Sequence, residues 1–304
     1  MNFSYRGIWP VAPTPFHPDG TLDLEGMKRV LDCIIDQGAD GICILANFSE
    51  QFLISDSERE VLTRLSIEHI AGRVPVIVTI SHYATQIAVE RAQFSKDLGA
   101  NIVMMMPPYH GALLKGNAQQ TFEQFQAVGE VGIPIMIQDA PLSGVDLPVS
   151  LLIKMAREIE MLKLFKIECP MAANKLRALI TEGGDMIEGP FDGEEAITLL
   201  ADLDAGATGT MTSGMIVDQI KPVIDLYHAG DIDGATAAYG RVAMVINHEN
   251  RQCGWRSCKA AMVDGGVIKS EFCRHPIEPL HPDIRTRLLS LLRPLDPIVL
   301  NWGK

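Results

Sequence analysis

The chain has 304 residues, of which 47% are hydrophobic and 21% charged, a composition typical of a globular protein with either one large core or a domain plus an appendage. Its formal net charge of −12 leaves no broad basic surface for nucleic acid, and acidic phospholipid headgroups would also be repelled. A small molecule is therefore the expected partner. An anionic one would need local donors to hold it against the field of the protein.

The N-terminal sequence MNFSYRGIWPVAPTPF lacks the charged start and the unbroken apolar run of a signal peptide. No later window offers the roughly 18 uninterrupted apolar residues of a membrane span. We therefore expect a cytoplasmic protein that does not bind a membrane.

The cysteines are scattered and form no repeating CxxC pattern, which disfavours a disulfide framework. They are Cys33, Cys43, Cys169, Cys253, Cys258 and Cys273. The last three, with His275 and His281, could be imagined as a metal cluster, but their spacings match no common zinc pattern. We expect reduced, structural thiols and no metal site.

Eight short apolar runs alternate with amphipathic stretches, the pattern of parallel strands joined by helices. The runs span residues 7–13, 40–46, 74–80, 101–107, 133–139, 161–167, 185–190 and 207–213. The intervening segments 24–38, 57–72, 84–99 and 118–132 have helical periodicity and close on glycine, as helix C-caps do. The sequence thus predicts an α/β fold, a (β/α)8 TIM barrel, over residues 1–214. The remainder, 215–304, is predicted to form C-terminal helices packed on the barrel.

One lysine stands out in the sixth run, MLKLFKIEC. Side-chain alternation places Lys166 on one face with Leu162 and Leu164, at the end of the strand where a barrel carries its reactive groups. A desolvated lysine amine can condense with a ketone, and the protonated imine then stabilises a carbanion on the neighbouring carbon. The alternative is a structural lysine paired with Glu168 or Asp139. Lys163 can extend out of the barrel bottom and is expected to be inert.

Several segments resemble the dihydrodipicolinate synthase and N-acetylneuraminate lyase superfamily, in order and over residues 7 to about 290. The opening 7–55 resembles its first two βα units, with Ala46-Asn47-Phe48-Ser49-Glu50 in place of the Gly-Thr-Thr-Gly-Glu loop. PPYH (107–110), QDAP (138–141), FKIE (165–168) and DGEEA (192–196) resemble the family's Pro-Tyr-Tyr, Tyr-Asn-Val-Pro, Ile-Lys-Glu and Gly-Asp-Asp-Ala segments. The resemblance implies that Lys166 forms the imine and that the protein is a homotetramer. No metal or organic cofactor is implied, since the imine is itself the electron sink.

The same resemblance suggests substrate-binding residues. Backbone amides of Asn47, Phe48 and Ser49 could bind the carboxylate of a 2-oxo acid, although Phe48 could instead plug the barrel mouth and Asn47 hold a turn. Gly193 and Met211 are predicted to line the pocket, with close backbone approach the reason for the glycine. Glu50 is expected to hold its loop by accepting backbone hydrogen bonds.

The departures from the family bear on the reaction. Gln138 replaces the family's catalytic phenol, and a glutamine cannot act as an acid or base. His110 occupies the position of a second tyrosine of the family's proton relay, and Tyr109 precedes it. Either residue could act as an acid or base, or have only a structural role. The arginine that follows the Tyr-Asn-Val-Pro segment in many members is absent.

Without the phenol, dehydration is favoured over aldol cleavage, since it requires loss of a C3 proton and protonation of the departing hydroxyl. The branch most resembled dehydrates 2-keto-3-deoxy sugar acids, which implies L-2-keto-3-deoxyarabonate as substrate and 2-oxoglutarate semialdehyde as product. The catalytic residues are then predicted to be Lys166, Tyr109, His110 and Gln138. Two alternatives remain open, a class I aldolase that releases pyruvate and a catalytically idle sugar-acid sensor.

Overall fold

The computed structural model describes residues 4–304, which divide into two compact units. The first unit consists of Pro75–Met211 with the segment before Gly7, and the second of Gly7–Val74 with Thr212–Lys304. The predicted boundary between residues 214 and 215 separates the barrel from the C-terminal helices, not these two units, and it stays a prediction.

Six parallel strands form the sheet of the first unit, in the order β10-β9-β8-β7-β4-β3. They are β3 (Val76–Thr79), β4 (Ile102–Met105), β7 (Ile135–Asp139), β8 (Leu162–Ile167), β9 (Gly189–Asp192) and β10 (Gly209–Thr210). Nearly every residue of these strands is buried, as expected for parallel strands with both faces covered. All six lie within or overlap the predicted runs.

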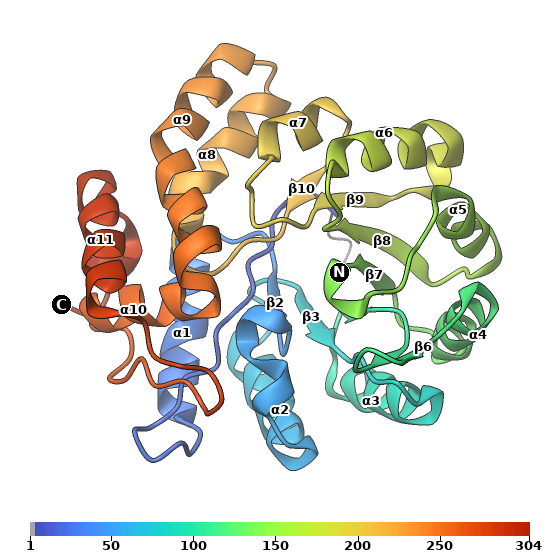
Figure 1. Ribbon diagram of the computed structural model, residues 1–304, viewed down its shortest axis with the longest axis horizontal. Helices are drawn as coiled ribbons and strands as arrows, with labels where there is room; N and C mark the ends of the chain where they lie inside the picture. Colours follow the sequence, from blue (N-terminus) through green and yellow to red (C-terminus); the bar gives the residue numbers. More distant parts are fainter. Residues whose placement is uncertain (1–3) are drawn as a thin grey trace. The chain divides into compact units, whose positions relative to one another are not determined.

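Helices lie along the outer side of this sheet, with α5 and α6 beside β8 (Figure 1). They are α3 (Thr85–Leu98), α4 (Ala118–Gly129), α5 (Val149–Glu158), α6 (Ala172–Gly183) and α7 (Leu199–Asp204), with the 3-10 turns η3 (Pro141–Ser143) and η4 (Gly184–Met186). Asn117 caps α4 by accepting from the amide of Gln120, and Gly99 ends α3 at a φ of +94°, a backbone conformation that glycine adopts without strain.

The sequence did not predict a small antiparallel hairpin that follows β4. Its strands are β5 (Tyr109–His110) and β6 (Leu114–Lys115), joined through Gly111 at a φ of +63°. The hairpin is too short to show an alternating pattern in the sequence.

The second unit carries strands β1 (Gly7–Ile8) and β2 (Ile42–Ile44), and Val11 forms parallel bridges to both Cys43 and Ser213. Its helices are α1 (Leu24–Asp36), α2 (Asp56–Ile70), α8 (Val217–His228), α9 (Ile232–His248), α10 (Ser257–Asp264) and α11 (Pro282–Leu292). Short turns complete it: η1 (Asn47–Ser49), η2 (Gln51–Leu53), the π-helical η5 (Glu249–Cys253), η6 (Gly254–Arg256), η7 (Arg293–Leu295) and η8 (Ile298–Leu300). The prediction that the C-terminal part of the chain is helical is thus confirmed by α8 to α11.

Candidate active site

Lys166 is the second-last residue of β8, and its side chain is 2% exposed. Its Nζ atom lies 2.7 Å from Oε1 of Glu168. A buried ammonium group is costly unless an anion accompanies it, and Glu168 supplies that anion. The predicted position of the lysine, at the carboxyl end of an apolar strand, is confirmed.

Gln138 lies on β7 directly beside Lys166 in the sheet register and is fully buried. Its Nε2 donates to Oε1 of Glu168 at 2.8 Å, so one carboxylate oxygen accepts from both the lysine and the amide. The Gln138 Oε1 atom is buried and accepts no hydrogen bond within residues 4–304. Because an unpaired buried acceptor is unfavourable, this oxygen suits a hydroxyl donor brought by a ligand.

Glu168 is the functional candidate that the sequence interpretation missed, since it entered only as a structural ion-pair partner. Its amide donates to the Asp139 carbonyl at 3.0 Å, which continues the parallel pairing one residue beyond β8. Positions two apart on a strand face the same side, so the spacing of Lys166 and Glu168 was a usable signal.

Asp139, the last residue of β7, is paired elsewhere. Its carboxylate lies 2.6 Å from the Nζ atom of Lys175 on α6. Burial raises the pKa of Asp139, and the neighbouring Lys175 partly offsets that effect. Of the two acids proposed as structural partners of Lys166, only Glu168 has this contact.

Gly193 follows β9 and packs closely against the end of β8. Its amide donates to the carbonyl of Ile167 at 3.0 Å. A Cβ atom at this position would stand 2.6 Å from Cγ of Glu168 and 2.8 Å from the Ile167 carbonyl oxygen. The predicted close approach is therefore present, and a side chain at this position would collide with Glu168. Met211, just after β10, is fully buried, and its amide donates to the carbonyl of Asp192 at 3.0 Å.

Tyr109 and His110 form β5 of the hairpin, paired with Lys115 and Leu114. Tyr109 is half-buried, and burial raises the pKa of its phenol. His110 is exposed, and its ring lies 6.5 Å from that of Tyr83. Because the phenol is neutral at neutral pH, it can donate a hydrogen bond, which suits Tyr109 for a polar contact with a ligand.

The turn Asn47–Ser49 belongs to the second unit, in η1. The Ser49 hydroxyl donates to the carbonyl of Ala12 at 2.7 Å and its amide to that of Ala46 at 3.0 Å, so both groups serve the turn itself. The side-chain oxygen of Asn47 accepts from Gln51 at 2.6 Å. The first amides of a helical turn have no partner inside the turn. Those of Asn47 and Phe48 are therefore the better candidates for binding an anion.

Glu50 follows the turn in the left-handed region, at a φ of +60°. Its carboxylate forms an ion pair with Lys259 of α10, and both side chains are fully buried. The lysine also donates to the Phe272 carbonyl at 3.0 Å and lies over the ring of Phe16. A distant lysine, rather than the expected backbone amides, therefore holds the Glu50 side chain.

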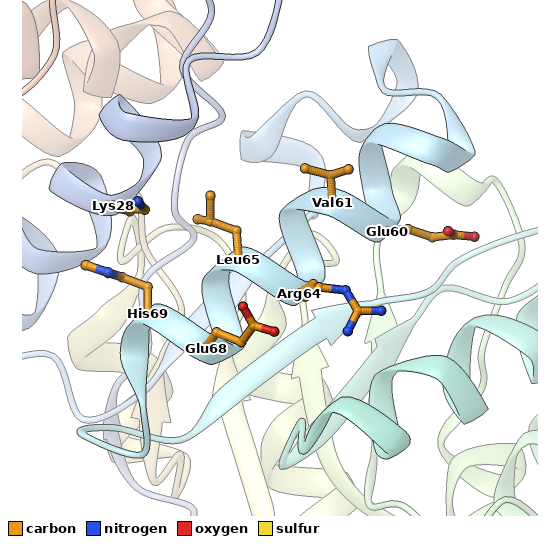
Figure 2. Close-up of a pocket in the computed structure, with 7 residues that line it drawn as sticks. All are labelled: Lys28, Glu60, Val61, Arg64, Leu65, Glu68 and His69. Carbon is orange, nitrogen blue, oxygen red and sulfur yellow. The ribbon is translucent and has the colours of Figure 1, made fainter.

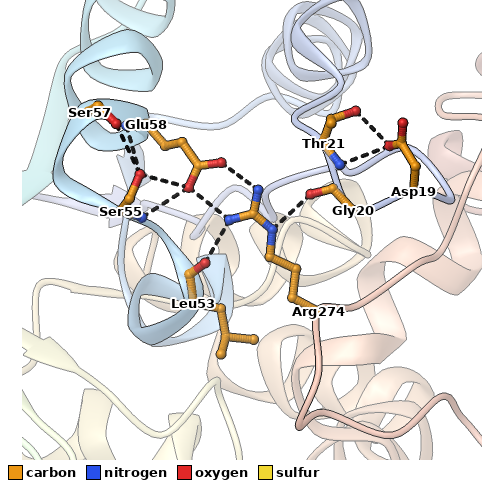
Figure 3. Close-up of polar contacts among 8 residues, drawn as sticks. All are labelled: Asp19, Gly20, Thr21, Leu53, Ser55, Ser57, Glu58 and Arg274. Atoms are coloured by element: carbon orange, nitrogen blue, oxygen red, sulfur yellow. Dashed lines mark hydrogen bonds and ion pairs between the residues drawn. The ribbon is translucent and has the colours of Figure 1, made fainter.

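Arg274 makes a second polar cluster in the same unit (Figure 3). Its guanidinium contacts both carboxylate oxygens of Glu58 and donates to the carbonyls of Leu53 and Gly20, at 2.7 and 2.9 Å. Glu58 also completes a capping box with Ser55 at the start of α2. One arginine thus joins the C-terminal segment to the cap of α2.

Substitution E58Q is expected to lower the free energy of unfolding by about 1–2 kcal/mol at pH 7, a figure reduced for partial exposure. The Arg274 guanidinium lowers the pKa of Glu58 from 4.5 to about 2. A depressed folded-state pKa stabilises the fold above pH 4.5, and this stabilisation is lost as the pH falls towards 2. Urea unfolding from pH 7 to 3 should therefore show the E58Q deficit shrinking with acid. The exposed neighbour variant E60Q is the control, and an acid-independent deficit would contradict the assignment.

Two surface hollows are lined wholly by residues of the second unit. One, of about 540 Å³, is an open groove between α1 and α2, lined by Lys28, Glu60, Val61, Arg64, Leu65, Glu68 and His69 (Figure 2). The other, of about 670 Å³, lies between the start of α1 and residues 266–269. Neither lining includes Lys166, Glu168 or Gln138. The groove mixes both signs of charge and does not select one kind of ligand.

Within the part of the chain that the structure describes, no helix is long and apolar enough to cross a membrane. No group of three or more His, Cys, Asp or Glu side chains is placed to hold a metal ion in residues 4–304.

Comparison with solved structures defines the class of fold. The chain superposes on the crystal structure of a presumed dihydrodipicolinate synthetase from Pseudomonas aeruginosa with a TM-score of 0.90, at 28% identity, over 95% of this chain and 99% of the other. The predicted (β/α)8 barrel with a C-terminal helical part is confirmed. The protein is thus a barrel that carries a buried, ion-paired lysine on its sixth barrel strand.

The chain belongs to the Dihydrodipicolinate synthetase family, whose profile matches residues 4–294. It is 57% identical to the L-2-keto-3-deoxyarabonate dehydratase of Azospirillum brasilense over 300 residues, which cover 98% of this chain and 97% of that protein. It is 29% identical to the 4-hydroxy-tetrahydrodipicolinate synthase of Herminiimonas arsenicoxydans over 288 residues, 92% and 94% of the two chains. The superfamily resemblance read from the motifs is therefore confirmed.

Proposed function

We propose that this protein is a Schiff-base-forming lyase that dehydrates L-2-keto-3-deoxyarabonate to 2-oxoglutarate semialdehyde. The observation that carries the proposal is the contact of buried Lys166 with Glu168, which in turn accepts from Gln138. The 57% identity over nearly the whole chain to a dehydratase named for this substrate supports the choice of reaction.

Lys166 forms the imine. Glu168 accepts the lysine proton, which frees the amine to attack the C2 ketone, and water leaves from the carbinolamine. The protonated imine then acidifies the C3 hydrogens by withdrawing electrons from the adjacent carbon. The burial of Lys166 excludes the water that would hydrolyse the imine early.

Glu168 is the proton carrier for the elimination. C3 of the imine is two bonds from Nζ of Lys166, so a carboxylate in contact with that nitrogen is within reach of a C3 proton. Glu168 takes the C3 proton and returns it to the C4 hydroxyl, which departs as water. Loss of a C5 proton and protonation at C3 give an enol, and protonation at C4 with loss of the enol O–H proton gives the aldehyde. Hydrolysis of the imine then releases the product and the free lysine.

Gln138 orients the substrate without exchanging protons. Its Nε2 holds Glu168, while its unpaired Oε1 accepts from a substrate hydroxyl. Without a phenol at this position the base for aldol cleavage is absent, which favours dehydration. Tyr109 and His110 are proposed as further polar contacts to the sugar chain.

For the carboxylate of the substrate we propose the amides of Asn47 and Phe48, with Ser49 shaping the turn. Gly193 and Met211 are proposed as pocket-lining residues. We further propose a homotetramer. Exposed leucines of the hairpin support an interface there, since Leu113 is 94% exposed and Leu114 is 48% exposed. The cytoplasmic location stays a prediction.

The test is to incubate the protein with L-2-keto-3-deoxyarabonate and measure semialdehyde and pyruvate together. We expect semialdehyde without pyruvate. In parallel, borohydride reduction with pyruvate as ligand should leave one adduct, which peptide mass spectrometry places on Lys166. Pyruvate release from the sugar acid would instead establish an aldolase, and no adduct with either ligand would support the sensor.

A further inference from the structure

Two carboxyl groups that interact electrostatically are buried in the same unit as Lys166. Asp192 ends β9 and Asp202 lies on α7, and both side chains are fully buried. Neither forms an ion pair with a cation within residues 4–304. Two ionised carboxylates cannot share such a place without a large electrostatic cost, so one of them holds a proton.

The hydrogen-bond donors show which acid is protonated. Both carboxylate oxygens of Asp192 accept hydrogen bonds. Oδ1 accepts from the Glu194 amide at 3.1 Å, and Oδ2 accepts from the Ala196 amide at 2.9 Å and from the Thr210 hydroxyl. Asp202 accepts at Oδ2 from Thr198 at 2.7 Å.

The other Asp202 oxygen, Oδ1, is buried and is reached by no donor within residues 4–304. The charge of Asp192 acts on Asp202, so a proton between the two acids lowers the cost of burying both. The proton therefore belongs to Asp202, which donates to Asp192, and Asp192 remains ionised.

The electrostatic surroundings agree with this assignment. Burial raises the pKa of both acids, and the charge of Asp192 helps to raise the pKa of Asp202 to about 7. Glu194, in the turn after β9, adds a further negative charge facing Asp202. Neighbouring elements also contribute uncharged groups: Thr210 of β10 and Thr198 before α7 supply hydroxyls. Ile180 of α6, which packs against Gly206 just after α7, is apolar.

Ionised Asp192 holds the turn of residues 193–196, whose backbone is strained. Glu195 and Ala196 both have positive φ angles, +51° and +66°, which side-chain-bearing residues adopt only when their surroundings hold them there. The amides that Asp192 accepts from belong to this turn, whose first residue is Gly193. Gly193 in turn packs against Glu168 and bonds to the end of β8.

We propose that protonated Asp202 and ionised Asp192 form a positioning pair that holds the Gly193 turn against Glu168, so that loss of the shared proton impairs turnover. This inference rests on the proposed role of Glu168 as proton carrier. Ionisation of Asp202 would bury two interacting negative charges and loosen the turn, which would leave Glu168 free to shift from Lys166. The effect should fall on kcat more than on KM, because no atom of the pair is assigned a contact with substrate.

The experiment compares pH profiles of semialdehyde formation for wild type, D202N and D202A. Asparagine can still donate to Asp192 and accept from Thr198 but cannot ionise, so D202N should match wild type at pH 6.5. By pH 8.5 its kcat should exceed that of wild type by about tenfold, the effect expected from one ionisation. D202A, which lacks the donor, should have a kcat about tenfold below that of D202N at both pH values. D185N, at an exposed carboxyl of the same unit, is the control and should follow wild type.

Identical alkaline limbs in wild type and D202N would overturn the inference. A second readout needs no turnover. Because the folded pKa of Asp202 is raised above its usual 3.8, wild type should lose stability between about pH 4 and 7. The melting temperature of D202N relative to wild type should therefore rise over that range and level off above it, and a constant difference would also overturn the pair. If wild type neither dehydrates the sugar acid nor traps pyruvate, the proposed function fails while this thermal test still decides on the shared proton.

Discussion

Substitution K166M is expected to abolish dehydration, with kcat/KM falling on the order of 10^4-fold or more, because no other group supplies the electron sink. Methionine has a similar length and should fill the same buried space, so the fold should survive. The borohydride adduct with pyruvate should disappear together with the activity. Semialdehyde formation, adduct mass and circular dichroism measured on the same preparation separate loss of chemistry from loss of structure.

The matched control is K163M, on the same strand. Lys163 is 29% exposed and pairs with Glu188 at 2.7 Å, away from the buried face. Its substitution should leave both kcat and the adduct on Lys166 within about twofold of wild type, as for most surface changes. An adduct that persists in K166M, or moves to another lysine, would refute the assignment of the imine.

Substitution E168Q is expected to lower kcat by about 10^2- to 10^4-fold, the usual contribution of a general acid–base group. Glutamine retains the shape and can still accept from Lys166 and Gln138, but it cannot carry a proton. The pyruvate adduct should therefore still form on Lys166, although more slowly, while the C3 proton exchange that follows imine formation should be lost. Deuterium exchange into pyruvate, followed by proton NMR, measures that step directly.

E188Q is the matched control for this variant, since it removes a carboxylate from a partly exposed ion pair of the same unit. It should leave both the exchange and the dehydration unchanged. Rapid exchange in E168Q would show that another base removes the C3 proton, and Tyr109 would then be the next residue to substitute.

The apolar runs were sufficient to locate the strands that carry the site. β7 and β8 end where the runs end, because burial on both faces requires continuous apolar sequence that is easily seen. β9 begins and ends later than its run, since Gly189, Pro190 and Asp192 are poor strand residues held in place by their neighbours. The hairpin of Tyr109 and Lys115 gave no periodic signal at all.

Some residues of the site could likewise be identified from the sequence, whereas others could not. Lys166 could be chosen from the sequence because a lysine at the end of an apolar strand is costly and because the family motif falls on the same position. Glu168, one position beyond the strand, resembles an ordinary loop acid until its contacts with Lys166 and Gln138 are seen. Gln138 was identified from the sequence as the replacement of a phenol that could still orient a hydroxyl, whereas its unpaired oxygen becomes visible only once its burial is known.

The sequence by itself determined the alternation of strands and helices, because this follows from local hydrophobicity. Together with the family motifs it also indicated the class of barrel and the lysine proposed to form the imine. Only the tertiary structure decided which groups meet: Glu168 with Lys166 and Gln138, Lys259 with Glu50 over 200 residues away, and the two acids Asp192 and Asp202. Hydrogen bonds and ion pairs depend on distances of a few ångströms between side chains. Those distances are set by how the strands register and how the turns pack, and no local pattern in the chain records them.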